Sequence, residues 1–153
     1  MEKKKLSALM TKISIVTASL FLLLLLLLHF LKPEISPSWR MISEYEIGRF
    51  GWLMQVAFFS LAAGTVCLAL ALRSQVQSVT GYIGLVLLLV IAVGMTMGGI
   101  FITGPITTPR DEIGMVSQLH NVGGSLAIFI SLSLIRRSEK WAEVRPPIIS
   151  NPP

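Results

Sequence analysis

The sequence is poor in charged residues and almost free of cysteine. Only 14% of its 153 residues are charged, whereas a soluble domain has about 25%. The single cysteine, Cys67, excludes a disulfide or a Cys-based zinc site within one chain. The chain has no P-loop and no dinucleotide fingerprint. Its net charge of +5 comes without a basic run interleaved with aromatics, so we expect no nucleic-acid partner.

What the sequence does contain is four long apolar stretches. They cover about 13–31, 51–72, 81–102 and 109–137, the last being most apolar from 119 to 135. At about 1.5 Å per residue each can cross a hydrocarbon core of about 30 Å. A chain in lipid must satisfy its own backbone hydrogen bonds, so these stretches should be helices. The sequence therefore predicts an all-α fold, a polytopic membrane four-helix bundle with short loops.

The distribution of Lys and Arg predicts the orientation. With the N-terminus inside, the cytoplasmic segments hold nine of these residues and the two outer loops hold four. This bias predicts cytoplasmic termini: a basic segment at 1–12 and a Pro-rich tail at 138–153, which we expect to be disordered from 143 on. A cleaved signal peptide competes for the first stretch, but the stretch is long and no small-residue cleavage site follows, so a retained helix is expected. The expected location is the inner or plasma membrane, with the lipid bilayer as partner.

Pairs of small residues four positions apart predict where helix backbones approach each other. Such pairs can serve homodimerisation, or contact with another membrane subunit, or packing within one bundle. Packing within the bundle is favoured because each of the four helices needs neighbours. The pairs are Gly94 with Gly98, Ser60 with Gly64, and Gly123 with Ala127.

The two outer loops hold most of the unusual polar residues, and ordinary structural roles fit many of them. Thr108 with Asp111 fits a capping box that would start the fourth helix near Pro109, and Ser43 with Glu46 fits another. Four aromatic residues fit a belt at the membrane interface. They are Trp39, Tyr45, Phe50 and Trp52.

His120 has two interpretations that the sequence leaves open. A helix that starts near Pro109 places it roughly 16 Å along the axis. Ser117, Asn121 and Gly124 share a wedge about 100° wide with it, and Gly124 suggests that this face meets a neighbour. We therefore expect His120 to point inward, toward the 43–45 segment and the outer end of the second helix. It is either a hydrogen-bonded structural residue or part of a functional site.

Candidate site residues follow from the polar side chains near His120. No GxSxG elbow or metal-binding motif is present, and we expect no cofactor. The catalytic candidates are His120, Asp111, Glu44 and Ser43; the binding candidates are Tyr45, Arg49, Trp52, Arg110 and Asn121; His29 and His120 are weak metal candidates.

Both outer loops resemble a known family. The residues Ile42-Ser43-Glu44-Tyr45 and Gly51-Trp52-Leu53-Met54, the stretch from Gly99 to Arg110, and Leu119-His120 with Gly123-Gly124 resemble the Domain of Unknown Function 998 family. The resemblance covers about 17–141 and implies a prokaryotic integral membrane protein without a settled activity. Members often have an acidic residue where this chain has Gly104, and they are usually longer, with more helices. The chain is then a short or truncated member, or a partner supplies further helices.

Three functions fit these observations. The first is a non-enzymatic membrane component, either a subunit of a complex or a small-molecule or lipid-binding module with an outward-facing polar pocket. The second is a membrane-embedded hydrolase that uses His120 with outer-loop acids. The third is a minor transporter or a haem- or metal-binding component, which is disfavoured because four helices are few and none has a charged midplane.

Overall fold

The chain folds into four long helices and two short 3-10 helices. The computed structural model describes residues 2–144, and their side chains as far as residue 134. The elements in chain order are α1 (Glu2–Leu31), η1 (Ile42–Glu46), α2 (Gly51–Arg73), α3 (Val79–Ile100), η2 (Arg110–Glu112) and α4 (Met115–Val144). Across the described residues there is no strand, and each long helix is long and apolar enough to cross a membrane. The all-α prediction with four membrane-spanning segments is confirmed.

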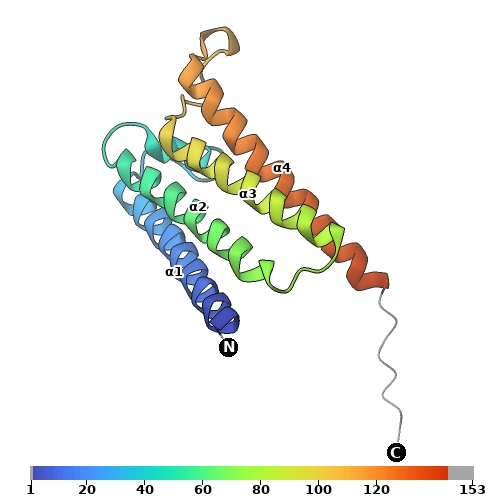
Figure 1. The fold of residues 1–153 in the computed structure, drawn as a ribbon. Coiled ribbons are helices and arrows are strands. Elements are labelled where there is room, and N and C mark those ends of the chain that lie inside the picture. The colour runs from blue at the N-terminus through green and yellow to red at the C-terminus, as the bar shows by residue number, and fades with distance from the viewer. Residues whose placement is uncertain (1, 145–153) are drawn as a thin grey trace, which may run out of the picture.

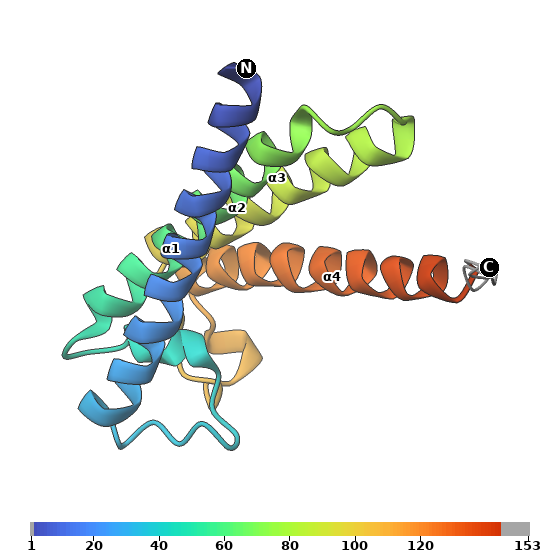
Figure 2. The same cartoon turned by 90° about the horizontal axis from the view of Figure 1, so that it is seen from below.

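The four helices form an open row in which each packs on its neighbour in the chain. α1 packs on α2, α2 on α3, and α3 on α4. In Figure 2, α1 and α4 lie at the two edges of this row and diverge. In their most apolar windows, 6% of the residues of α1 and 17% of those of α4 are buried, against 44% in α2 and 33% in α3. The edge helices therefore expose most of their apolar surface.

Small residues mark the tightest helix contacts. A Cβ added at Gly94 would lie 2.5 Å from the carbonyl oxygen of Gly123, and one added at Gly64 would lie 2.5 Å from Thr17 Oγ1. These glycines join α3 to α4 and α2 to α1, which confirms their use in packing within the chain. The expectation for Gly124 was wrong: no atom lies within 4 Å of its added Cβ, because Gly123 and Ala127 form the contact face.

The best-buried core lies at one end of the row. We call it the loop end: α1 and α3 end there, α2 and α4 begin there, and the connections 32–50 and 101–114 gather there (Figure 1). Leu28, Tyr45, Met54 and Ala57 are at most 1% exposed and come from α1, η1 and α2. The opposite end holds the start of α1 and the short connection from Ser74 to Ser78.

The fourth helix begins later than the sequence predicted. Around Thr108 and Pro109 the chain makes two turns, in which Thr108 N donates to Pro105 O and Glu112 N donates to Pro109 O, each at 3.0 Å. α4 starts only at Met115. Gly114 is a poor helix former, which explains why the helix does not extend back through it. The capping box at Thr108 is therefore wrong.

The second predicted capping box is also absent. Met41, not Ser43, is the N-cap residue of η1, and it makes no side-chain cap hydrogen bond. The carboxylate of Glu46 instead reaches the connection between α3 and α4. A long-range contact has replaced the local one.

Both terminal segments are helical where they are described. Residues 2–12 belong to α1, and residues 138–144 continue α4. The expected disorder of the tail is contradicted for residues 143 and 144, and the rest of that prediction lies outside the described residues.

Candidate functional site

The short helix η1 is the centre of the loop end. Four consecutive residues of η1 are buried although three of them are polar: Ser43, Glu44, Tyr45 and Glu46. Buried polar groups are costly unless they are hydrogen-bonded. The partners of these side chains therefore show how the loop end is held together.

Lys32 connects the end of α1 to η1. Its ammonium donates to the carbonyl oxygen of Tyr45 at 3.1 Å and also to that of Ile47. The side chain is only 3% exposed. Burial lowers the pKa of Lys32 below its ordinary value, and the nearby charge of Glu34 partly opposes this. A cation at the carbonyl end of a short helix is favourable, so Lys32 fixes η1 in place.

Tyr45 and His29 form a second contact between α1 and η1. The Tyr45 hydroxyl donates to Ile35 O at 3.3 Å, and its ring centroid lies 5.2 Å from that of His29. His29 Nδ1 donates to Leu25 O at 2.7 Å. Burial raises the pKa of Tyr45, and the charge of Glu34 adds to the effect. Assigning Tyr45 to an interfacial belt was therefore wrong, whereas Trp39 and Trp52 are 58% and 61% exposed as a belt requires.

Glu44 joins the two connections and is fully engaged. One carboxylate oxygen pairs with Arg40 Nε, and the other accepts a hydrogen bond from the backbone N–H of Ile106. The side chain is 1% exposed. Its role in the fold is a bridge between the first loop and the α3–α4 connection.

Glu46 lies two residues further on, and only one of its two carboxylate oxygens is hydrogen-bonded. Its Oε2 accepts from the backbone N–H of Thr103 at 3.3 Å and lies 3.4 Å from Nδ1 of His120. Its Oε1 is buried and has no hydrogen-bond partner among the described residues. Burial raises the pKa of Glu46 to about 7, and the hydrogen bond from Thr103 opposes this more weakly. Glu46 is thus a buried carboxyl that titrates near neutral pH.

His120 points into the bundle, as the sequence predicted. It is 5% exposed, and its ring lies edge-on to Phe58 of α2 with centroids 5.9 Å apart. Its Nδ1 lies 2.6 Å from the carbonyl oxygen of Phe101. A carbonyl can only accept, so Nδ1 carries the proton, and in the neutral ring Nε2 keeps its lone pair. The contact in η1 is Glu46, one residue past the segment we expected.

The other catalytic candidates do not gather around His120. Glu44 is engaged elsewhere, Ser43 is buried with no hydrogen bond to His120, and Asp111 is exposed on η2. The acid beside His120 is Glu46, which sequence reasoning had assigned to a cap. Glu44 and Glu46 are two residues apart in one segment, so only the tertiary contacts distinguish them.

The remaining binding candidates lie on the surface. Trp52, Arg110 and Asn121 are exposed, and the exposed guanidinium of Arg49 lies 4.6 Å from the centroid of the Phe50 ring. No three His, Cys, Asp or Glu residues come together to hold a metal in the part of the chain that the structure describes. His29 and His120 belong to separate contacts, with Tyr45 and with Glu46.

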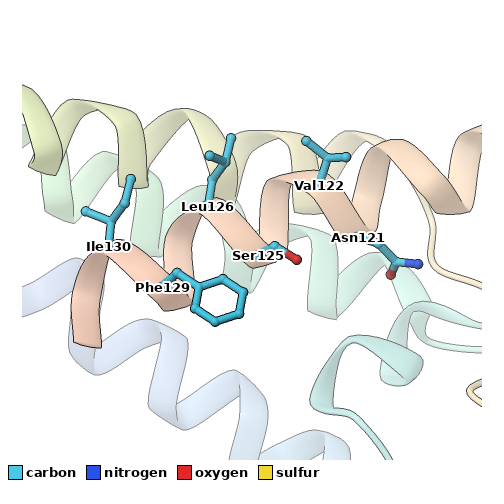
Figure 3. A pocket seen from close by; sticks show the side chains of 6 residues that line it. All are labelled: Asn121, Val122, Ser125, Leu126, Phe129 and Ile130. Carbon is cyan, nitrogen blue, oxygen red and sulfur yellow. The ribbon is translucent and has the colours of Figure 1, made fainter. Parts of the chain in front are cut away.

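A shallow groove runs along α4, beginning at the residue after His120. Figure 3 shows that all six lining residues come from this one helix, so the groove is open along its length. Its volume is about 370 Å³. Four of the lining residues are apolar, and Asn121 and Ser125 are polar; the full set is Asn121, Val122, Ser125, Leu126, Phe129 and Ile130.

The fold defines an all-α membrane protein with four helices that can span a bilayer and a buried polar cluster at one end. Residues 15–148 match the family described as protein of unknown function (DUF998), and the chain belongs to this family. No curated protein and no solved structure matches it.

Proposed function

We propose that this chain is a lipid-binding component of the inner or plasma membrane, with its site at the loop end. The polar part of the lipid binds at Glu46 and His120. The observation that carries this proposal is Glu46 Oε1, a buried carboxylate oxygen with no partner among the described residues.

The energetic argument rests on the contrast with Glu44. Both carboxylates are at most 3% exposed, but both oxygens of Glu44 are bonded within the chain. Burying a charged group without full compensation costs several kcal/mol. A ligand that donates an N–H or O–H to Oε1 removes part of this cost. Such a site is favourable for binding and unfavourable for the stability of the ligand-free chain.

The site's position supports a lipid over a water-soluble molecule. It lies where α1 and α3 end and α2 and α4 begin, and the groove starts at the exposed Asn121, on the same turn of α4 as the inward-facing His120. The groove's four apolar residues suit an acyl chain, and Asn121 and Ser125 suit an ester or hydroxyl group. The hydrolase alternative lacks comparable support, because no nucleophile among the described residues hydrogen-bonds to His120.

The test uses the full chain in nanodiscs with three probes. Phosphatidylethanolamine offers an ammonium donor, diacylglycerol offers a hydroxyl donor, and phosphatidylcholine offers neither. Native mass spectrometry should show that one or both donor lipids are retained over phosphatidylcholine. Glu46→Gln should remove the preference for the ammonium donor and weaken the preference for the hydroxyl donor, because a neutral amide oxygen is a weaker acceptor than a carboxylate. Glu112→Gln, the same change at an exposed acid of the same loop cluster, should keep both preferences.

The pH dependence separates the two donor classes. An ammonium needs the ionised carboxylate, so its retention should increase as pH rises through about 7, the pKa of Glu46. A hydroxyl ligand also binds the neutral carboxyl, although less strongly, so its retention should increase less. Equal retention of all three lipids by the unmodified chain, or an unchanged preference in Glu46→Gln, would contradict the proposal.

The proposed orientation has cytoplasmic termini, which places the loop end on the outer side. It is supported by the nine-to-four distribution of Lys and Arg. A reporter that is active only outside the cytoplasm, fused to the C-terminus, should give no signal. A strong signal would reverse the orientation and move the site to the inner leaflet.

A further inference from the structure

A second cavity lies at the opposite end of the molecule, between the start of α1 and the end of α2. Its volume is about 450 Å³. It is independent of the Glu46 site, because its lining comes from the other ends of these two helices. Each helix contributes one cation, Lys3 from α1 and Arg73 from α2.

The lining combines positive charge with apolar surface. Leu6, Met10 and Leu70 form the apolar part, and Ser7 and Ser74 provide hydroxyl groups. No acidic residue lines the cavity. Two cations without a facing carboxylate attract an anion, and the apolar part favours a ligand with hydrocarbon attached.

The two sides of the cavity are fixed relative to each other. The Ser7 hydroxyl donates to the carbonyl oxygen of Ala71 at 2.8 Å, directly linking α1 to α2. This bond lies one helical turn from Lys3 and two residues from Arg73. The cavity is therefore held by a cross-helix hydrogen bond, although its two cationic side chains are exposed.

Its location identifies the ligand class. Arg73 is the last residue of α2, and Lys3 lies in the basic segment that precedes the apolar part of α1 and packs beside the end of α2, so both cations lie near one membrane surface. Basic pockets between transmembrane helices at this depth bind the phosphate groups of anionic lipids. We infer that this cavity binds an anionic phospholipid, with its phosphate between Lys3 and Arg73 and its glycerol and upper acyl chain against Leu6, Met10 and Leu70.

The experiment compares two double variants of equal charge in nanodiscs that contain phosphatidylglycerol and phosphatidylcholine of the same chain length. Lys3→Gln with Arg73→Gln removes both cations of the cavity. Lys4→Gln with Lys5→Gln removes two exposed cations of the same helix end that do not line it. Native mass spectrometry measures which lipid each variant retains.

The unmodified chain should retain phosphatidylglycerol over phosphatidylcholine. The Lys3→Gln, Arg73→Gln variant should reduce this preference by about fivefold for each of the two cations removed. The Lys4→Gln, Lys5→Gln control should reduce it less than twofold in total. An equal reduction in both variants would mean a diffuse surface charge and would overturn the inference. Competition by millimolar inorganic phosphate would show a soluble anion site and would overturn it too. The Glu46→Gln variant should keep the full preference, so this proposal and the proposed function can fail separately.

Discussion

The two ends of the helix row are built in different ways. At the loop end, charged and polar side chains are buried and hydrogen-bonded between segments far apart in the sequence, as Glu44 and Glu46 are to the α3–α4 connection. At the opposite end the connection from Ser74 to Ser78 is mostly exposed, and among the side chains that the structure describes there, one cross-helix hydrogen bond is present, from Ser7 to the carbonyl oxygen of Ala71. The same four helices thus have a buried, hydrogen-bonded polar cluster at the loop end and an exposed basic cavity at the opposite end.

This difference has a consequence for function. Long-range hydrogen bonds between buried groups hold their partners in a defined geometry, which suits a site that recognises one polar group. Exposed cations on two helices tolerate motion, which suits a ligand attracted mainly by charge. The contrast predicts that mutations at the loop end cost more stability than equivalent ones at the opposite end.

The largest effect is expected at a glycine of the loop end. A Cβ at Gly51 would lie 1.9 Å from the carbonyl oxygen of Glu46, so Gly51→Ala forces η1 away from α2. We expect a loss of about 3 kcal/mol, measured by unfolding in detergent. Gly84→Ala, in α3 with no atom within 4 Å of its added Cβ, should be neutral or stabilising by about 0.5 kcal/mol. Similar losses in both variants would refute the contrast.

A smaller loss is expected on breaking the Glu44 bridge. Glu44→Gln removes the charge that pairs with Arg40 and weakens the bond from Ile106 N–H. The expected loss is about 2 kcal/mol, since a buried pair has lost one charge. Glu46→Gln should instead leave the stability unchanged or raise it, because it replaces a half-satisfied buried carboxyl. If Glu46→Gln destabilises as much as Glu44→Gln, Glu46 is an ordinary structural residue.

Glu46 also predicts how stability depends on pH. Its pKa of about 7 in the folded chain lies above the ordinary 4.5, so the folded state binds the proton more tightly than the unfolded state does. The stabilisation that comes from this tighter proton binding by Glu46 is fully present below pH 4.5 and is lost as pH rises to about 7. We expect a decrease on the order of 2 kcal/mol over this range. The difference between the unmodified chain and Glu46→Gln, measured by thermal unfolding at each pH, isolates this contribution from other titrating groups.

The smallest effect is expected at the opposite end. Ser78 is the N-cap of α3, and its hydroxyl accepts from Gly81 N–H at 3.1 Å. Ser78→Ala should cost about 1 kcal/mol or less, since the cap is exposed and water can replace it. Lipid retention at either site should not change. A cost above that of Glu44→Gln would show that the opposite end is the more tightly held one.

The sequence by itself determined the membrane-spanning helices. It also indicated the inward direction of His120, although Gly123, not Gly124, marks the face of α4 that meets a neighbour. Apolar stretches long enough to cross a bilayer leave the backbone no alternative to helix, so α2 and α3 were predicted within two residues of their observed bounds. Small residues at intervals of four likewise predicted close helix contacts at Gly94 and at Gly123, and the structure shows that these two glycines meet each other. These features are local or periodic, and a single chain is enough to reveal them.

Only the tertiary structure decided the roles of the polar residues. Two residue pairs have the spacing of a helix capping box: Ser43 with Glu46, and Thr108 with Asp111. In neither pair does the acid serve as a cap. Glu46 meets Thr103, 57 residues away, and Glu44 meets Ile106, 62 residues away. A buried carboxylate gains more from a backbone N–H shielded from water than from an exposed local cap, and residue spacing does not reveal which side chain will be buried. For this physical reason the acid beside His120 could be identified only from the fold.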